Sequence, residues 1–516
     1  MANTQAFIGI DVGTTSVKAL LVDEIGHIIN EASVEQKINF PYPSWAEQDP
    51  EMWWSNTKTA IIDVLTTHDR SPTSIDIQAI GLSGQMHSSV FLDSKGEVIR
   101  PAILWNDGRT SLQRNEITTR IGISRLSETV GNLPLEGFTI TKLLWLRDNE
   151  PINYSRLNSL LLPKDFIRMK LTGETATENS DASGTILFDI HKLEWSKEIL
   201  EDLDLPKTVL PRVTESTDIS GRVTKTVSKT LGIKEGIPVI SGGADNAAGA
   251  VATGAVSKGI VQASIGTSGT VLTTIDTPSV DTKLRLHTFC HCAKNKWYLM
   301  GTMLTAGSSL NWLRQLLMEI PDETSYESMI RNTSHNQPGA AGLFFLPYLN
   351  GERTPHNNPD ARGVFFGMHM NHERKHFTQA VLEGVCYAMK DSLNLMSKTT
   401  GEFKDLRIIG GGSRSIIWRK VLADITGVPV STIQPEGGPA YGAALMAAVG
   451  NGHFDTVEQV TKEWTSLGET IEPNLIIHEI YEELYEEYRM LYGSLRENFI
   501  RTANLLNQIN KKRAGI

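Results

Sequence analysis

The sequence has little of several things, and each shortage excludes a class of protein. Among 516 residues only Cys290, Cys292 and Cys386 are cysteines. Three thiols cannot form the disulfide framework of a small secreted domain, so we expect a reducing, cytoplasmic location. We also expect no secretory signal, because no basic segment followed by an apolar core opens the chain. No apolar run is long enough to cross a bilayer, which argues against a membrane partner.

An excess of basic residues is also missing. The formal net charge is −10 and the isoelectric point is about 5.8. Nucleic acids and anionic membranes are bound by basic surfaces, so neither is an expected partner. An anionic nucleotide remains compatible with this charge, because local donors and a cation decide its binding. The length exceeds what one hydrophobic core supports, and we expect two large domains.

Residues 287–292 (His-Thr-Phe-Cys-His-Cys) have the composition of a metal cluster but not its spacing. On a strand, alternate side chains point to opposite faces, which would separate these ligands. No second Cys/His cluster with zinc spacing follows in the sequence. We therefore interpret this segment as a half-buried strand.

Residues 8–23 contain the most informative pattern. Two apolar segments are joined by a Gly-Thr-Thr-Ser turn, and Asp11 lies near the end of the first segment. Small residues let backbone N–H groups approach an anion, and the hydroxyl groups add donors. A carboxylate beside such a turn can hold a hard cation. The pattern is equally typical of an ordinary hairpin in which Asp11 caps the turn.

A second copy of this pattern lies about half a chain further on. Residues 263–272 again form an apolar segment, a Gly-Thr-Ser-Gly turn and a second apolar segment. The spacing indicates a diverged duplicated domain and not a short-period repeat. We align Gly266 with Asp11, so the first copy would supply a metal carboxylate and the second mainly phosphate donors. Chance similarity is the alternative, because one glycine-rich turn is a weak signal.

The rest of the chain alternates between strand and helix patterns, which is typical of α/β layers in both halves. Asp49 and Pro50 are suited to begin a helix as N-cap and first residue. No low-complexity linker is present. Expected strands lie within 5–35, 77–83, 238–240, 258–303 and 406–409, with a strand or loop at 103–109. Expected helices cover 50–65, 110–170 with a break at 131–134, 305–318, 377–399, 437–444 and 475–510.

Three consecutive glycines, Gly410–Gly412, follow the apolar residues 406–409 and precede a helix start. Such a turn lets a flat or anionic ligand touch the backbone and leaves helix N–H groups available to it. The spacing is neither the dinucleotide fingerprint nor a P-loop lysine motif. A tight strand-to-helix turn without a ligand is the alternative.

Several side chains have both a chemical and a structural interpretation. Asp245 precedes a helix rich in alanine and glycine, and it is either an N-cap or a general base. Met86 and His87 follow a strand in a small-residue turn and are either ligand contacts or packed residues. Trp105 and Asp107 combine an aromatic face with hydrogen-bonding polarity, which suits a sugar, or they are a buried tryptophan and a turn residue.

Motifs spread in order over nearly the whole chain make a family recognisable. Two longer segments cover 137–149 and 363–383, and shorter ones cover 84–87, 104–109, 162–165, 180–185, 243–250 and 351–358. Together these motifs resemble those of the FGGY family of carbohydrate kinases. One departure is Ser88, which stands where the bacterial members have glycine.

The resemblance implies an α/β fold with two ribonuclease-H-like domains around a deep cleft, as in actin, sugar kinases and chaperone ATPases. The N-terminal domain would cover residues 5–250 and hold the sugar, the metal and the first phosphate hairpin. The C-terminal, nucleotide-binding domain would cover 255–455. A helical segment at 456–516 would pack on the body.

The resemblance also implies that the protein uses ATP and Mg²⁺ to phosphorylate a ketopentose, with D-xylulose as the first candidate. Asp245 would be the catalytic base and Asp11 would serve the Mg²⁺ ion. The sugar would contact Met86, His87, Trp105, Asp107 and Asn246. The nucleotide would contact Gly13, Thr14, Thr15, Lys18, Gly266, Thr267, Ser268, Gly410, Gly411, Gly412, Ser413 and Arg414.

Two alternatives belong to different classes. One is a kinase of the same family for ribulose, gluconate or glycerol. The other is an actin-like binding protein that is switched by a nucleotide. A carboxylate that faces a sugar pocket favours the enzyme over the binding protein. We expect a small sugar as its partner, and the sequence is compatible with a homodimer.

Overall fold

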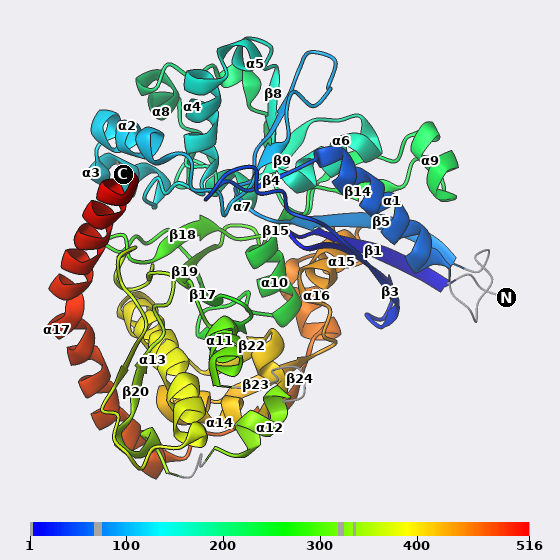
Figure 1. The fold of residues 1–516 in the computed structure, drawn as a ribbon. Coiled ribbons are helices and arrows are strands. Elements are labelled where there is room, and N and C mark those ends of the chain that lie inside the picture. The colour runs from blue at the N-terminus through cyan, green and yellow to red at the C-terminus, as the bar shows by residue number, and fades with distance from the viewer. Residues whose placement is uncertain (1–3, 67–74, 318–324, 334–336, 515–516) are drawn as a thin grey trace.

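The computed structural model describes residues 4–66, 75–317, 325–333 and 337–514 (Figure 1). Two seven-stranded sheets organise it. The first sheet has the order β13-β14-β5-β1-β2-β3, and β15 pairs with the end of β5. Its strands are β1 (Thr4–Val12), β2 (Ser16–Asp23), β3 (Ile28–Glu35), β5 (Ile75–Gly84), β13 (Ile219–Arg222), β14 (Pro238–Ile240) and β15 (Gly243–Ala244).

The second sheet has the order β18-β19-β17-β16-β22-β23-β24. Its strands are β16 (Ile260–Ile265), β17 (Gly269–Ile275), β18 (His287–Cys290), β19 (Trp297–Met303), β22 (Asp405–Ile409), β23 (Val430–Gln434) and β24 (Ser466–Ile471).

The two sheets share one topology. In the first, β1 pairs antiparallel with β2, β2 antiparallel with β3, and β1 parallel with β5. In the second, β16 pairs antiparallel with β17, β17 antiparallel with β19, and β16 parallel with β22. The hairpins β1–β2 and β16–β17 are therefore equivalent elements, and the expected duplicated α/β architecture is confirmed.

Helices and short strands complete the N-terminal half. The helices are α1 (Pro50–Leu65), α2 (Ser111–Ile121), α3 (Ile123–Val130), α4 (Thr139–Asn149), α5 (Pro151–Ser155), α6 (Pro163–Thr172), α7 (Asn179–Ser183), α8 (Lys197–Asp202), α9 (Lys225–Leu231) and α10 (Asp245–Thr253). The short strands are β4 (Glu47–Gln48), β6 (Val90–Leu92), β7 (Ala102–Ile103), β8 (Ser159–Leu161), β9 (Ala176–Glu178), β10 (Phe188–Asp189), β11 (Glu194–Trp195) and β12 (Arg212–Thr214).

The C-terminal half is built in the same way, and its last helix runs along one side of it (Figure 1). The helices are α11 (Gly307–Leu317), α12 (Tyr326–Arg331), α13 (Arg374–Thr400), α14 (Ile416–Thr426), α15 (Gly438–Gly450), α16 (Val457–Trp464) and α17 (Leu475–Ala514). The strands β20 (Phe344–Leu346) and β21 (Val364–Phe366) form a small hairpin. The helix expected at 305–318 corresponds to α11, and residue 318 lies outside the described residues.

Strand β1 is buried on both faces, which explains its nearly continuous apolar sequence. Ile8 and Ile10 share a core cluster with Trp53 of α1, whereas Phe7 clusters with Tyr441 of α15. Helix α1 begins as expected, because the Asp49 carboxylate accepts a hydrogen bond from the Glu51 amide at 3.0 Å.

Helix α15 ties the two halves together. It packs on β1 and β5 of the first sheet and crosses α10. The crossings need glycine, because a Cβ atom on Gly9 or Gly442 would lie 1.9 Å from the carbonyl oxygen of Ala440 or Ala248, respectively. Residues 438–450 thus pack against the N-terminal sheet, although the expected boundaries group them with the C-terminal domain.

Strand β18 corrects one expectation and supports another. Its residues His287–Cys290 form a strand, but all are buried, so the segment is not half-buried. The physical reason is that both faces are covered: on one face Asn132 bonds to the His287 ring at 2.8 Å, and on the other the Thr288 hydroxyl donates to the Ser279 carbonyl at 2.7 Å. Within the described residues, no helix is long and apolar enough to span a membrane.

Candidate active site

A cavity of about 260 Å³ lies between the two halves of the chain. The N-terminal half lines it with Met86, His87, Trp105, Leu135, Gly137, Phe138, Asp245 and Asn246. The C-terminal half lines it with Ser264, Ser268, Thr270, Met300, Thr302 and Arg353. The cavity therefore brings together Asp245 and four of the five residues that we expected to contact a sugar.

Asp245 is the first residue of α10 and the acidic residue among the described residues that line the cavity. Burial and the nearby carboxylate of Asp11 raise its pKa to about 7. The backbone and side-chain amides of Asn246 both donate to Asp245 Oδ1, at 2.7 and 2.9 Å. The other carboxylate oxygen has no hydrogen bond within the described structure, so it can accept a proton from a bound hydroxyl group.

Asp11 has the properties of a cation ligand. Burial raises its pKa to about 6, and its Oδ1 atom is buried without a hydrogen-bond partner among the described residues. A carboxylate oxygen left without a donor is stabilised by a hard cation such as Mg²⁺, which prefers oxygen ligands. Lys18 stands opposite Asp11 in the hairpin, but its ammonium group pairs with Glu31 at 3.1 Å.

The first hairpin turn offers donors for an anion. The backbone N–H groups of Gly13, Thr14 and Thr15 donate to no group within the described chain. The Thr14 hydroxyl is already engaged, because it accepts from the Trp105 indole at 2.9 Å and donates to Gln85 at 3.3 Å. The amides are therefore the donors that an anion would use. The Thr14–Trp105 contact also joins this turn to the wall of the cavity.

The second hairpin turn lies beside the triple-glycine turn. A Cβ atom on Gly410 would lie 2.7 Å from the Ile265 carbonyl oxygen, which places Gly410–Gly412 next to Gly266. The N-terminus of α11 closes on the same turn, because the Gly307 amide donates to the Gly266 carbonyl at 2.8 Å. Gly266 and the turn of Gly410–Gly412 thus lie side by side.

The structure corrects our alignment of the two hairpins. Asp11 is the second-last residue of β1, and the second-last residue of β16 is Ser264. Gly266 therefore matches Gly13 and not Asp11. The reason is the strand register: in each hairpin a single apolar residue, Val12 or Ile265, separates the polar residue Asp11 or Ser264 from the glycine that begins the turn. The inference that only the first copy carries the carboxylate is unaffected.

His87 is held in one tautomer and in a strained backbone conformation. Its φ angle is 68°, a region that non-glycine residues adopt at a cost. Nδ1 contacts the Gly184 carbonyl oxygen at 2.7 Å, so this nitrogen carries the proton. Burial lowers the pKa to about 3, so the ring is neutral. Its Nε2 atom is then an acceptor for a ligand hydroxyl.

Asp107 is not where we expected it. It does not line the cavity and is only 2% exposed. Its Oδ2 atom accepts from the Ala46 amide at 2.6 Å and from Arg109 at 2.7 Å, and Oδ1 accepts from Arg109 at 2.9 Å. The carboxylate is therefore saturated by protein donors. Its effect is to hold the turn that follows Trp105.

Arg353 is a cavity residue that the sequence did not single out. It lies between Glu352 and Thr354 in a loop of the C-terminal half. Its guanidinium group makes no hydrogen bond or ion pair within the described residues, although the side chain lines the cavity. An unpaired guanidinium with five donors facing a cavity is a ready ligand contact. The motif at 351–358 was the only signal that could have drawn attention to it.

Ser88, the departure from the family pattern, has a structural role. It is completely buried, and its hydroxyl accepts from the Trp105 amide at 3.1 Å and donates to Gln85 at 3.0 Å. Ser88 thus fixes the backbone of a residue in the cavity wall.

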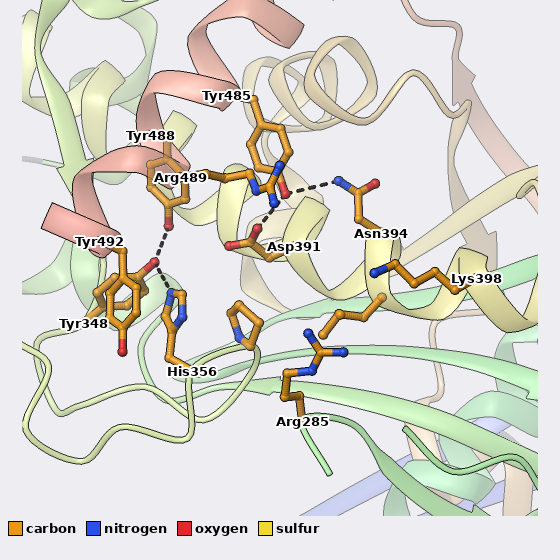
Figure 2. Close-up of a pocket in the computed structure, with 13 residues that line it drawn as sticks. Arg285, Tyr348, His356, Asp391, Asn394, Lys398, Tyr485, Tyr488, Arg489 and Tyr492 are labelled. Carbon is orange, nitrogen blue, oxygen red and sulfur yellow. Dashed lines mark hydrogen bonds between the residues drawn. The ribbon is translucent and has the colours of Figure 1, made fainter. Parts of the chain in front are cut away.

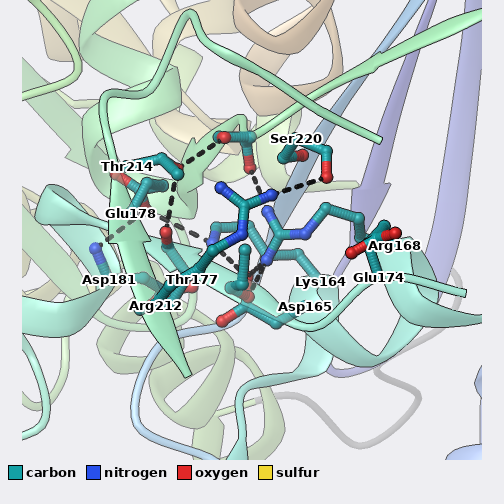
Figure 3. Close-up of polar contacts among 12 residues, drawn as sticks. Lys164, Asp165, Arg168, Glu174, Thr177, Glu178, Asp181, Arg212, Thr214 and Ser220 are labelled. Atoms are coloured by element: carbon teal, nitrogen blue, oxygen red, sulfur yellow. Dashed lines mark hydrogen bonds and ion pairs between the residues drawn. The ribbon is translucent and has the colours of Figure 1, made fainter. Parts of the chain in front are cut away.

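Side chains of α6, β9 and α7 form a buried ion cluster (Figure 3). We define it as Lys164, Asp165, Arg168, Glu178 and Asp181, which are all completely buried. The Lys164 ammonium lies 2.7 Å from Asp165, 3.3 Å from Glu178 and 3.1 Å from Asp181. Burial raises the pKa of Asp181 well above its usual value, which lets two cations balance the remaining two carboxylates.

The ion cluster is bonded to the segment that carries Asp245. Arg168 donates to the Ser241 carbonyl at 3.1 Å. The Ser180 hydroxyl donates to Glu178 at 2.9 Å and accepts from the Ala244 amide at 3.0 Å. The backbone before Asp245 is therefore fixed by side chains that themselves have little freedom.

Comparisons with known proteins agree with this geometry. Sequence profiles of the FGGY family of carbohydrate kinases match residues 6–252 for its N-terminal domain and 261–450 for its C-terminal domain. A xylulose kinase of Lactococcus lactis is 40% identical over 494 residues, 95% of this chain and 97% of that protein.

Solved structures are similar over nearly the full length. A ligand-bound xylulose kinase of Lactobacillus acidophilus has a TM-score of 0.89 at 26% identity, covering 96% of this chain and 100% of that one. A gluconate kinase of the same organism has a TM-score of 0.90 at 25% identity, covering 97% and 100%. This chain thus belongs to the FGGY family of carbohydrate kinases.

Proposed function

We propose that this kinase transfers the γ-phosphoryl group of ATP to the terminal hydroxyl of D-xylulose. The observation that carries the proposal is Asp245, a carboxylate with a pKa near 7 at the wall of a cavity that residues of both halves line. The 40% identity to a xylulose kinase over 95% of the chain supports the choice of sugar.

The proposed step is an in-line displacement. The terminal sugar oxygen forms a bond to the γ-phosphorus, the bond from that phosphorus to the β-phosphate oxygen breaks, and ADP leaves. Asp245 accepts the proton of the hydroxyl group as the new bond forms. The amides of Gly13–Thr15 and the surface at Gly266–Ser268 would hold the phosphate oxygens. Mg²⁺ bound at Asp11 would neutralise phosphate charge.

The other cavity residues would recognise the sugar. His87 presents Nε2 as an acceptor, because Nδ1 is committed to Gly184. Met86 and Trp105 give apolar walls, and Asn246 holds Met86 Sδ at 3.8 Å. Arg353 supplies donors from the opposite half, so a bound sugar would contact both halves at once. Domain closure around it would exclude water and limit wasteful ATP hydrolysis.

A second candidate is gluconate. The unpaired guanidinium of Arg353 suits a carboxylate, and a gluconate kinase has the same fold as this chain. A polar site rejects a ligand that leaves its groups unpaired, so one substrate should be clearly preferred.

A sugar panel separates these candidates. ADP release is coupled to a spectrophotometric readout with D-xylulose, D-ribulose, D-gluconate and glycerol as acceptors, and kcat/KM is compared. We expect D-xylulose to be best and the Asp245→Asn variant to lose roughly 10²- to 10⁴-fold in kcat with every acceptor that the wild type uses. A higher kcat/KM for gluconate would replace D-xylulose in the proposal. Nucleotide hydrolysis without any preferred acceptor would contradict a kinase. The cytoplasmic location, the absence of a nucleic-acid partner and a homodimer stay predictions.

A further inference from the structure

A second cavity, of about 450 Å³, lies in the C-terminal half between α13, α17 and the loop that contains His356 (Figure 2). It shares no lining residue with the sugar cavity. Its lining consists of Arg285, Tyr348, Pro355, His356, Asp391, Asn394, Leu395, Lys398, Tyr485, Tyr488, Arg489, Tyr492 and Gly493. The volume is within the usual range for small-molecule sites.

This cavity offers two acceptors for hydroxyl groups, the buried Asp391 and the exposed Asn394. Asp391 is 8% exposed, and its Oδ1 atom accepts from Tyr485 at 2.5 Å. Its second oxygen has no hydrogen bond within the described structure. Asn394 donates its amide to the same Tyr485 hydroxyl at 3.1 Å, which leaves the Asn394 carbonyl oxygen available. Figure 2 shows both side chains beside Tyr485.

Three cations line the same cavity. Lys398 is exposed and forms no ion pair within the described residues. Arg285 and Arg489 each pair with one carboxylate, Asp281 at 2.6 Å and Glu486 at 3.0 Å, and neither of these carboxylates lines the cavity. The lining holds these three cations and one carboxylate, Asp391, so an anionic group on the ligand is favoured. A phosphate has enough oxygen atoms to accept hydrogen bonds from all three cations.

Aromatic rings form the remaining wall. Tyr348 donates or accepts in hydrogen bonds with His356 at 3.1 Å and with Tyr488 at 3.0 Å. The His356 ring stacks on Tyr492 with centroids 3.3 Å apart. These rings are therefore held in place by the protein. Tyr348 and Tyr488 are buried, so the faces open to a sugar are those of the half-buried His356 and Tyr492.

We propose that this second cavity is an effector site for a small phosphorylated sugar. The phosphate would lie among Lys398, Arg489 and Arg285, and the hydroxyl groups would bond to Asp391 and Asn394. A neutral sugar would offer no anion to the three cations. Inorganic phosphate would offer no sugar hydroxyl groups to Asp391 and Asn394. The proposal goes beyond the phosphorylation chemistry and does not depend on which sugar is the substrate.

One loop connects the two cavities. Arg353 lines the sugar cavity, whereas Pro355 and His356 line the second cavity. Thr354 between them is completely buried. Its hydroxyl donates to the Arg285 carbonyl at 2.8 Å and accepts from the Thr302 amide at 3.0 Å. A ligand that shifts Arg285 or His356 would therefore shift Arg353, and the coupling has to be reciprocal.

Calorimetry on the full chain tests the binding, with D-ribose 5-phosphate as the probe and inorganic phosphate and AMP as comparisons. We expect one binding site per chain, at least tenfold weaker in the double variant Lys398→Ala/Arg489→Ala. The exposed Lys258→Ala is the matched charge control and should bind like the wild type. The variant His87→Ala alters the sugar cavity and should also bind like the wild type.

Three binding results overturn the proposal. The first is unchanged affinity in the double variant, and the second is loss of binding in His87→Ala, which would assign the probe to the sugar cavity. The third is tighter binding of phosphate or AMP than of D-ribose 5-phosphate, which would exclude a sugar phosphate as the ligand class.

A kinetic measurement tests the coupling. Saturating D-ribose 5-phosphate should change the KM for the acceptor sugar at least twofold in the wild type and not in the double variant. The assay uses whichever acceptor is most active in the sugar panel, so an error in the proposed substrate does not affect it. An unchanged KM in the wild type with the probe bound would overturn the effector role.

Discussion

At the scale of single residues, Asp245 unites the features of a general base. Its pKa of about 7 places it near the pH at which proton transfer is most effective. The change Asp245→Asn keeps the shape and the bonds to the Asn246 amides but removes the ability to take a proton. We expect kcat to fall roughly 10²- to 10⁴-fold while the affinity for ADP, measured by calorimetry, is unchanged. A kcat within a factor of three of the wild type would contradict the role.

Arg353 supports a second prediction at this scale. Within the described residues its guanidinium forms no hydrogen bond or ion pair, so its removal leaves no hydrogen-bond partner stranded and the fold should be unaffected. We expect Arg353→Ala to lower kcat/KM for the sugar about 10- to 100-fold, the usual effect of losing a charged hydrogen bond. Arg353→Lys, which keeps the charge but not the fork of donors, should lose less. A normal KM for the sugar in both variants would show that the side chain does not contact it.

Sequence reasoning found part of the cavity lining and missed the rest for physical reasons. Met86, His87 and Asp245 follow strands, where chain direction predicts that side chains gather at one edge. Asp107 was misplaced, because nothing in the sequence shows that Arg109, two residues later, folds back to take its carboxylate. Arg353 was overlooked, because it lies in an irregular loop whose position depends on the whole C-terminal half.

At the scale of elements, the ion cluster connects α6, α7 and the strand before Asp245. Removing Lys164 leaves buried carboxylates without their cation, which costs about 3–5 kcal/mol in comparable proteins. We therefore expect Lys164→Met to lower the apparent melting temperature clearly. Lys170→Met on the same helix, whose partner Glu51 is exposed, should cost less than about 1 kcal/mol. Differential scanning calorimetry compares them, and equal shifts would contradict a structural role of the cluster.

The contact between α13 and α17 predicts a pH dependence. Glu383 Oε1 accepts from Gln379 at 2.8 Å, from Tyr481 at 2.9 Å and from the Gly339 amide at 3.0 Å, and burial raises its pKa from 4.5 to about 7. The folded state then holds its proton longer than the unfolded state. Stability therefore falls as the pH rises from about 4.5 to about 7, by roughly 3 kcal/mol in total.

Glu383→Gln removes this titration and keeps the acceptor oxygen. We expect the melting temperature of the variant to gain on that of the wild type between pH 5 and pH 8. The exposed Glu479→Gln on α17 serves as the control and should follow the wild type at every pH. A constant difference between Glu383→Gln and the wild type would exclude the proposed titration.

Elements were predictable where the pattern is local. The glycine turns identified the two hairpins, and Asp49 with Pro50 identified the start of α1. The position of α15 was not predictable. Its alanine- and glycine-rich sequence indicates close packing, but only the tertiary structure shows that the partner is the sheet of the other half.

At the scale of the whole molecule, the two halves meet through small residues that also set the geometry of the site. Helix α10 begins with Asp245, and α15 packs both on α10 and on β1, near whose end Asp11 lies. The distance between the two acidic groups thus depends on how closely these helices approach. The crossing of α10 and α15 thus connects the element that carries Asp245 with the strand that carries Asp11.

Gly442 lies at this crossing and provides the test. A Cβ atom there would lie 1.9 Å from the Ala248 carbonyl oxygen, so Gly442→Ala must push α10 and α15 apart. We expect a loss of about 1–3 kcal/mol, as for other overpacked sites, together with a lower kcat, because Asp245 moves with α10. On α17, a Cβ atom at Gly493 would have no neighbouring atom within 4 Å. Gly493→Ala should therefore stabilise the folded protein by about 0.5–1 kcal/mol and leave kcat unchanged. Calorimetry and the coupled assay measure both variants. If Gly442→Ala had the melting temperature and the kcat of the wild type, the crossing would not control the position of the Asp245 carboxylate.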